Sequence, residues 1–203
     1  IGSTSIAELQ LKWLSKQGVE RFILTLNKRF FPVFLPPALR EFLPKLDFSW
    51  EEKPIGDEGG LKKALELLEG EEVIVINGDT LHELPLSLLQ TSPSMVVGHP
   101  RAPWGVLEKK FIPPSTRLVT EPLPLESFYK FEEKPILPLW VNIGVYRFPK
   151  SIKSELLDDG MMPEHIIPKL LQENRLNVVF WEGRWKGIDT PKDVEEAEKG
   201  WLA

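Results

Sequence analysis

A short acidic turn, Asn77-Gly78-Asp79, directly follows the most apolar segment of the chain, residues 73–76. In an open α/β sheet, ligands bind beyond the carboxyl ends of the strands, and an aspartate placed there can hold a divalent metal on a polyphosphate. Gly and Asp are also common in turns without any ligand, so both interpretations stay open. His82, three residues after Asp79, could reach a phosphate from there, but we expect it to be a solvated loop residue.

A glycine-rich segment, residues 56–60 (G-D-E-G-G), lies immediately before a predicted helix over 61–68. The first N–H groups of a helix lack backbone partners, and together with the helix dipole they attract phosphate groups. Gly56, Gly59 and Gly60 have no side chain, so a base or phosphate could approach the backbone closely. A glycine-rich helix start is also common without a ligand, and the segment alone is a weak signal.

Two neighbouring segments contain charged and polar residues. Glu133 and Lys134 end one predicted strand, and Asn142 and Gly144 lie in the next. Taken alone, Glu133 and Lys134 are an exposed ion pair worth under about 1 kcal/mol, and Asn142 and Gly144 mark a β-bulge.

A second acid, Asp189, lies just before the last predicted helix. Its carboxylate would serve as a second metal ligand, because carboxylate oxygens suit divalent cations. Asp189 or Thr190 would equally serve as the N-cap of this helix, since Pro191 suits the first helical position. The sequence leaves the metal ligand and the cap open for Asp189.

The composition of the 203-residue chain narrows the classes of function. Its 25 Lys and Arg against 30 Asp and Glu give a formal net charge of −5, which disfavours nucleic acid as a partner. The absence of cysteine rules out disulfides, thiolate metal sites and cysteine nucleophiles. It fits a cytoplasmic protein and equally fits a protein from a hot-growing source that avoids labile residues. No apolar run approaches the roughly 18 residues that span a bilayer, and no leader sequence is recognised, so we expect no membrane partner.

Helical and strand patterns alternate along the chain, which predicts a single α/β domain over residues 1–203. Ser5 and Glu8 form the pattern of a capping box. Four consecutive β-branched residues at 73–76 predict a fully buried, parallel, central strand. Proline-rich turns then separate short strands that we expect to lie antiparallel over the sheet edge. The predicted helices cover 6–17, 36–42, 61–68, 163–172 and 191–201, the longer strands 21–26, 48–51, 73–76, 140–148 and 177–181, and the short strands 95–97, 104–107, 117–119 and 128–131.

Taken in this order, the segments resemble the sugar-phosphate nucleotidyltransferase family, which includes mannose-1-phosphate guanylyltransferases and glucose-1-phosphate thymidylyltransferases. Members join a nucleoside triphosphate to a sugar 1-phosphate, giving a nucleoside diphosphate sugar and pyrophosphate. The resemblance extends over nearly the whole chain. Residues 54–61 are similar to the family segment P-L-G-T-A-G-A-L, 75–79 to its strand ending in N-G-D, 131–135 to F-x-E-K-P, 142–146 to N-x-G-x-Y, and 185–193 to W-x-D-I-G-T-P-x-D.

The resemblance implies a Rossmann-like, three-layer α/β fold with a mostly parallel central sheet and a small antiparallel β extension. It implies a Mg²⁺-dependent in-line attack of the sugar phosphate on the α-phosphorus, which needs positioning and charge neutralisation more than a base. The implied catalytic residues are Asp79, Lys134 and Asp189, with Asp79 and Asp189 on the metal; Gly56, Gly59, Gly60 and Gly78 contact the nucleotide; Gly105, Glu133, Asn142 and Gly144 line the sugar pocket.

The chain departs from the family pattern at two places. The third position of W-x-D-I-G-T is Gly187, and the acid follows as Asp189, a form closer to the I-D-T-P of cytidylyltransferases and molybdenum-cofactor guanylyltransferases. The family's first strand and its G-x-G-T-R-L loop, which cradles the triphosphate, do not precede Ile6. The start at Ile1 in place of Met favours a truncated chain.

Three hypotheses about function remain. The first is a nucleotidyltransferase that uses a nucleoside triphosphate and a sugar 1-phosphate. The second is an inactive paralogue or truncated form that binds one of these ligands and regulates or pairs with a partner, and the third is an α/β interaction module without a ligand. A homo-oligomer is open in each case, because an uncovered sheet edge favours pairing.

Overall fold

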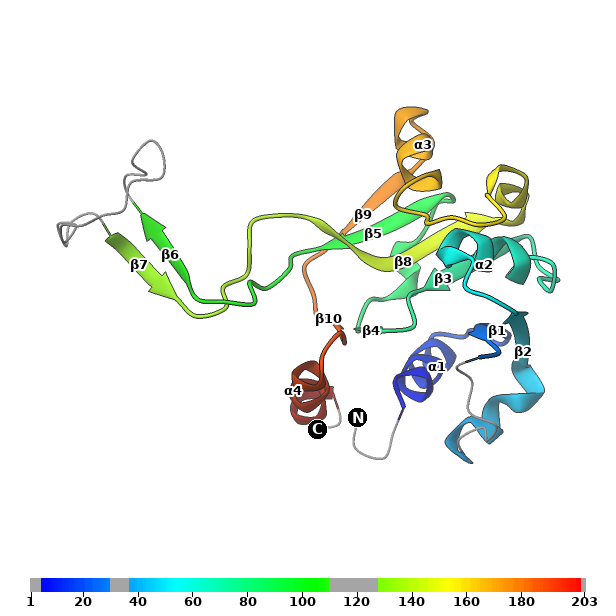
Figure 1. The fold of residues 1–203 in the computed structure, drawn as a ribbon, viewed down its shortest axis with the longest axis horizontal. Coiled ribbons are helices and arrows are strands. Elements are labelled where there is room, and N and C mark those ends of the chain that lie inside the picture. The colour runs from blue at the N-terminus through cyan, green and yellow to red at the C-terminus, as the bar shows by residue number, and fades with distance from the viewer. Residues whose placement is uncertain (1–4, 30–36, 110–127, 202–203) are drawn as a thin grey trace.

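A computed structural model describes residues 5–29, 37–109 and 128–201 (Figure 1). Helices and strands alternate over most of this length, as the sequence predicts. The α-helices are α1 (Ile6–Lys16), α2 (Gly56–Ala64), α3 (Ile166–Gln172) and α4 (Pro191–Trp201), and 3₁₀ helices cover Pro37–Lys45, Leu86–Leu88 and Lys150–Glu155. The strands are β1 (Phe22–Asn27), β2 (Leu46–Glu51), β3 (Glu72–Ile76), β4 (Thr80–His82), β5 (Ser94–Gly98), β6 (Val106–Lys109), β7 (Phe128–Glu132), β8 (Val141–Pro149), β9 (Asn177–Trp181) and β10 (Trp185–Gly187).

The largest sheet has the strand order β3-β8-β5-β9 and is mixed. Strand β8 runs antiparallel to both β3 and β5, whereas β9 runs parallel to β5. Apolar side chains pack on both faces of this sheet. Val73 and Val75 pack on one face with residues of α2 and α3, and Ile74 and Ile76 pack on the other with Trp13 of α1. The predicted α/β architecture, with helices on both faces of a sheet, is therefore confirmed.

The prediction of a central, parallel, fully buried strand at residues 73–76 is wrong. Strand β3 lies at the edge of its sheet, is antiparallel to β8, and has half-buried side chains. The run of β-branched residues correctly indicates that both faces of the strand are packed. It does not report how many of the strand's two edges are paired, because pairing depends on distant segments.

The free edge of β3 faces a slot of about 1060 Å³, and β1 lies on the other side of this slot. Strand β1 pairs with β2 in a separate parallel sheet. Arg21, just before β1, forms an ion pair with Glu69, just before β3, at 3.4 Å, so both strands start at the same end of the slot. Leu11 of α1 and Leu61 of α2 also line the slot. The slot therefore has the boundaries of one strand position, and no strand of the described ranges occupies it.

Strands β6 and β7 form an antiparallel arm that extends away from the rest of the molecule (Figure 1). The prediction of a small antiparallel extension is confirmed. The arm does not lie over the sheet edge, and the predicted short strand at 95–97 is instead β5, inside the main sheet. The predicted strand at 117–119 lies outside the described residues.

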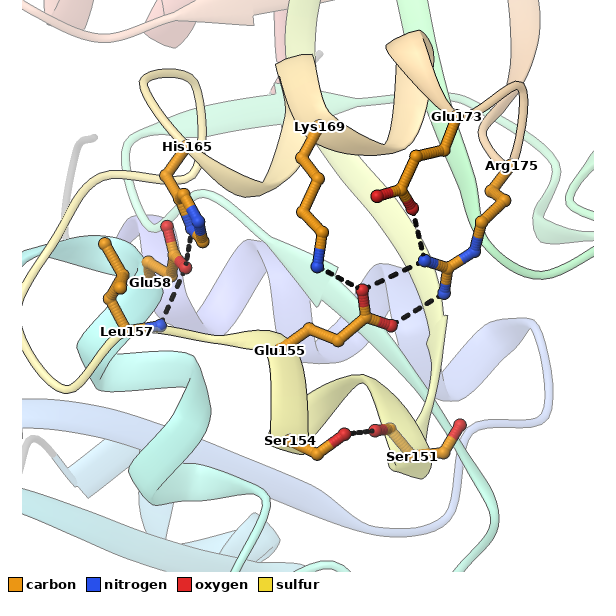
Figure 2. Close-up of polar contacts among 9 residues, drawn as sticks. All are labelled: Glu58, Ser151, Ser154, Glu155, Leu157, His165, Lys169, Glu173 and Arg175. Atoms are coloured by element: carbon orange, nitrogen blue, oxygen red, sulfur yellow. Dashed lines mark hydrogen bonds and ion pairs between the residues drawn. The ribbon is translucent and has the colours of Figure 1, made fainter.

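A cluster of charges fixes α3 to the end of β8 (Figure 2). Glu155 ends the 3₁₀ helix that follows β8, and its carboxylate binds Arg175 at 2.6 Å and Lys169 of α3 at 2.6 Å. The hydrogen bonds from Arg175 and then Lys169 lower the pKa of Glu155 from 4.5 to about 2. The ionised carboxylate is thus stabilised in the folded chain.

We expect the Glu155 cluster to stabilise the fold at neutral pH and to lose this contribution in acid. The pKa of Glu155 is lower in the folded than in the unfolded chain, so its contribution is complete above about pH 5 and is lost as the pH falls toward 2. Because the partners are partly exposed, we expect about 1 kcal/mol. Urea unfolding at pH 7 and pH 3 should show a smaller pH difference for Glu155→Gln than for the unaltered chain. The exposed Glu164→Gln control should keep the full difference; equal differences for both variants would contradict the assignment.

Candidate active site

The turn after β3 places Asp79 at the carboxyl end of the strand. Gln10 of α1 holds this turn, since its Nε2 donates to the backbone oxygens of Asn77 and Thr80, both at 2.7 Å. The Oδ1 of Asp79 accepts a hydrogen bond from the Thr80 hydroxyl at 2.9 Å. Gly78 and Asp79 are exposed and lie at one end of the slot. The carboxylate of Asp79 is therefore accessible from solvent.

Asp189 lies next to the Asp79 turn. Strand β10 pairs antiparallel with β4, with Gly187 opposite Thr80. The backbone N–H of Ile188 donates to the backbone oxygen of Asp79 at 2.8 Å. A Cβ atom placed on Gly187 would lie 3.5 Å from Oδ2 of Asp189. The pairing of β4 with β10, two short strands far apart in sequence, thus brings both acids to the same edge.

Thr190 is the N-cap of α4, which leaves Asp189 without the capping role that the sequence had offered as one of its two interpretations. The Thr190 hydroxyl accepts from Asp193 N at 3.3 Å, and Oδ2 of Asp193 accepts from Thr190 N at 2.9 Å. This is the reciprocal arrangement of a capping box. Within the described ranges, Asp189 makes no side-chain hydrogen bond to the helix start. The interpretation of Asp189 as the cap is therefore wrong, while its role on a metal stays a prediction.

Asn142 and Gly144 of β8 lie beside the same turn. Gly144 has a φ of +74°, and its backbone oxygen accepts from Asn77 N at 2.8 Å. A Cβ on Gly144 would lie 2.5 Å from Cγ of Asn77, so only glycine fits there. Oδ1 of Asn142 accepts from Gly144 N at 2.9 Å. The register of β5 against β8 shifts in this stretch, so these residues do mark a bulge, one that adjoins Asn77.

Lys134, Glu133 and Gly105 form a second group near the base of the β6–β7 arm. A Cβ on Gly105 would lie 2.3 Å from Cζ of Phe131 and 2.8 Å from Oε2 of Glu133, so Gly105 leaves room for both side chains. Lys134 has a φ of +50°, which is uncommon for a residue with a side chain. Its Nζ binds Glu196 of α4 at 3.0 Å. The hydrogen bond that Lys134 donates to Glu196 raises the pKa of Lys134.

Gly56 and Gly59 of α2 pack against the chain's own backbone. The helix begins at Gly56, earlier than predicted, so the glycines lie inside the helix and not in a segment before it. A Cβ on Gly56 would lie 1.9 Å from the Gly160 oxygen, and one on Gly59 would lie 2.5 Å from the Asp158 oxygen. A Cβ on Gly60 would approach Oε1 of Glu51 at 2.7 Å. Contact of these glycines with a nucleotide stays a prediction.

Acidic side chains of α2 hold the loop that covers its N-terminus (Figure 2). Glu58 is fully buried, and its Oε1 accepts from Leu157 N at 2.8 Å and contacts Nδ1 of His165 at 2.7 Å. Asp57 accepts from Met162 N at 2.6 Å. The backbone N–H of Glu58 donates to Gly160 at 3.1 Å, so this donor is not free for a phosphate.

The prediction that His82 is a solvated loop residue is wrong. His82 ends β4, its side chain is buried, and its ring lies 5.7 Å from that of Trp13. Burial lowers the pKa of His82 to about 4, so the ring is neutral at pH 7. His82 is therefore part of the packing between α1 and β4.

Sequence reasoning missed Gln10, Lys186 and Glu196. Gln10 orders the Asp79 turn, and Lys186 of β10 binds Glu196 at 2.9 Å and Asp193 at 3.0 Å. The hydrogen bonds from Lys186 and then Lys134 lower the pKa of Glu196 to about 2. Gln10 and Glu196 belong to no motif and Lys186 takes a variable position of the segment 185–193, so only their contacts across the fold reveal them.

The donor set at this edge fits a magnesium ion bound together with a substrate. Mg²⁺ usually takes one or two carboxylates from a protein and completes its shell with water and phosphate oxygens. Asp79 and Asp189 are two exposed carboxylates on adjoining turns. No group of three or more His, Asp or Glu side chains that could hold a metal occurs in the described ranges. The two aspartates would therefore need the oxygens of the substrate.

None of the helices in the described part of the chain has the length and apolar character needed to cross a membrane.

Comparison with curated proteins relates the chain to sugar-1-phosphate guanylyltransferases. No family model matches the chain. It is 27% identical over 190 residues to the mannose-1-phosphate guanylyltransferase catalytic subunit beta of Dictyostelium discoideum, covering 91% of this chain and 52% of that protein. It is 31% identical over 97 residues to the D-glycero-alpha-D-manno-heptose 1-phosphate guanylyltransferase of Campylobacter jejuni, covering 47% and 43%. The chain thus spans about half the length of the curated relatives it matches.

Comparison with solved structures gives the fold. The chain matches HddC from Yersinia pseudotuberculosis with a TM-score of 0.66 and 22% identity, over 96% of this chain and 84% of that one. It matches a putative glucose-1-phosphate thymidylyltransferase from Bacillus anthracis with a TM-score of 0.64 and 13% identity, over 96% and 81%. The fold is therefore the Rossmann-like α/β fold of sugar-phosphate nucleotidyltransferases, as the resemblance implies.

Proposed function

We propose that the chain is the nucleotidyltransferase part of an enzyme that joins a nucleoside triphosphate to a sugar 1-phosphate and releases pyrophosphate. The observation that supports this best is the meeting of Asp79 and Asp189 at the carboxyl edge of β3, where Ile188 N binds the Asp79 backbone oxygen at 2.8 Å. The two curated relatives described above are named guanylyltransferases, so we propose GTP and a hexose or heptose 1-phosphate as the first substrates to test. A cytoplasmic location follows from the cysteine-free composition as part of the same proposal.

We assign Asp79 and Asp189 to a magnesium ion, which when bound neutralises charge on the phosphate oxygens. Lys134 binds the phosphate of the sugar 1-phosphate and holds it for in-line attack on the α-phosphorus, and pyrophosphate leaves from the opposite side. Glu133 and Asn142 hold sugar hydroxyl groups. Gly105 is compatible with this role, because a Cβ there would lie 2.8 Å from Oε2 of Glu133 as well as 2.3 Å from the ring of Phe131.

The slot between β1 and β3 bears on whether the triphosphate-binding part of the site is complete. We propose that it is the position of the strand that carries the triphosphate-binding loop in the family. The support is its shape: it has a strand edge on either side, α1 and α2 on its faces, and the Asp79 turn at one end. Gly78 would then contact the nucleotide at that end, with Gly56, Gly59 and Gly60 placed on the α2 side.

The proposal is tested by pyrophosphate release from the purified chain with Mg²⁺, four nucleoside triphosphates and a panel of sugar 1-phosphates. We expect turnover that EDTA removes, with GTP preferred. Binding of the substrates should be measured in parallel by calorimetry, so that substrate binding is known even for a folded chain that shows no turnover. Failure to bind any of the nucleotides or sugar phosphates would contradict the proposal; binding without turnover would support the site and contradict activity of this length of chain.

A further inference from the structure

The ammonium group of Lys134 is held by a carboxylate 62 residues away in sequence. Its Nζ lies 3.0 Å from Oε1 of Glu196 on α4, and only a third of the side chain is exposed. Because a carboxylate and a phosphate compete for the same ammonium, Glu196 occupies the position that a phosphate ligand of Lys134 would take.

Glu196 has a second cation, Lys186 of β10, whose Nζ lies 2.9 Å from Oε2. One carboxylate therefore joins two lysines that come from different elements, one oxygen for each. Lys186 is the more enclosed of the two lysines, with 22% of its side chain exposed against 33% for Lys134. If Lys134 left, Glu196 would still be paired, and the exchange would not create an isolated carboxylate.

Asp193 is anchored independently of this exchange. Its Oδ2 accepts from the backbone N–H and the hydroxyl of Thr190 at 2.9 and 2.7 Å, and its Oδ1 binds Lys186 at 3.0 Å. Lys186 is thereby held between two acids of α4, whereas Lys134 forms an ion pair with Glu196 alone among the residues that the structure describes. The hydrogen bonds from Lys186 and Lys134 keep Glu196 ionised throughout the neutral range, since its pKa is about 2.

We propose that Glu196 is a latch on Lys134 that opens when a phosphate group binds, and that Lys186 retains Glu196 in the open state. This inference rests on the proposed function in one respect, the assignment of Lys134 to the sugar phosphate. Glu196 and Lys186 are positioning residues, because they act on the ligand through Lys134. The latch weakens phosphate binding by the free energy of the Lys134–Glu196 ion pair. Because Glu196 lies on α4, phosphate binding changes the contacts of this helix.

The test is a double-mutant cycle read by calorimetric titration with mannose 1-phosphate and, separately, inorganic phosphate at fixed ionic strength. Glu196→Gln is expected to tighten binding roughly two- to fivefold, the range that partly exposed ion pairs give. Lys186→Met is expected to weaken it by a similar factor, because Glu196 would then hold Lys134 alone. In the Glu196→Gln background, Lys186→Met should have no further effect.

Controls separate the latch from general electrostatics and from the proposed function. Glu195→Gln makes the same charge change on the same exposed helix and should leave affinity unchanged, whereas Lys134→Met should abolish phosphate binding. Where turnover is measurable, KM for the sugar phosphate should change in the two latch variants while kcat stays constant. Additive effects in the cycle, or an equal change in Glu195→Gln, would overturn the latch alone. Absence of phosphate binding in every variant including the unaltered chain would overturn the proposed role of Lys134 and the latch together.

Discussion

Exchange of Asp79 for asparagine is expected to reduce Mg²⁺-dependent pyrophosphate release roughly 10³-fold. The carboxylate lies at the carboxyl end of β3, exposed and directed by a turn that Gln10 fixes at 2.7 Å. A metal ion supplies several kcal/mol of charge stabilisation, and each 1.36 kcal/mol is a factor of ten in rate. Asparagine keeps the shape and an acceptor for the Thr80 hydroxyl, so the melting temperature should not change.

A second measurement makes the Asp79 prediction independent of turnover. Mn²⁺ binding in the presence of GTP, followed by electron paramagnetic resonance, should weaken in Asp79→Asn. The surface variant Asp159→Asn removes a charge from an exposed loop and should keep both activity and Mn²⁺ binding. A variant at Asp79 that binds Mn²⁺ as well as the unaltered chain would show that the turn is only structural.

Exchange of Gly56 for alanine is expected to destabilise the fold by about 3 kcal/mol. Gly56 has a φ of +73°, and alanine pays roughly 1–2 kcal/mol in that left-handed conformation. The new Cβ would lie 1.9 Å from the Gly160 oxygen, which forces α2 and the loop apart and adds a further 1–3 kcal/mol typical of overpacking. The backbone bonds from Glu58 to Gly160 at 3.1 Å and from Gly160 to Ile55 at 3.0 Å would be strained or lost.

Gly78→Ala is the matched control for Gly56→Ala. No atom lies within 4 Å of the Cβ that alanine would add at Gly78. Its expected effect on the free energy of unfolding is therefore within about 0.5 kcal/mol. Urea unfolding of both variants at pH 7 measures the difference. Equal midpoints for the two variants would show that the loop over α2 moves aside without loss of stability, contrary to the packing described.

The sequence by itself determined most of the longer elements and the starts of α1 and α4. Ser5 and Glu8 predicted the start of α1, and the hydrogen bond from Glu8 N to the Ser5 hydroxyl at 3.1 Å confirms it. Thr190 and Pro191 predicted the start of α4 in the same way. These predictions succeed because a cap and a helical period involve residues only a few positions apart.

The motif residues were predicted as a set, but the sequence did not show which of them meet. Asp79 and Asp189 adjoin only because β4 and β10 pair, and Asn142 reaches the same turn only through the bulge at Gly144. Thr190, and not Asp189, caps α4, a choice that both residue types permitted.

Tertiary structure alone decided three features: the open edge of β3, the burial of His82, and the capture of Lys134 by Glu196. Each depends on segments far apart in sequence that come together when the apolar faces of the helices and the sheet are buried. A local pattern records which faces of an element are apolar. It does not record which partner covers a face, pairs with an edge or neutralises a charge, because those contacts are chosen by the packing of the whole chain.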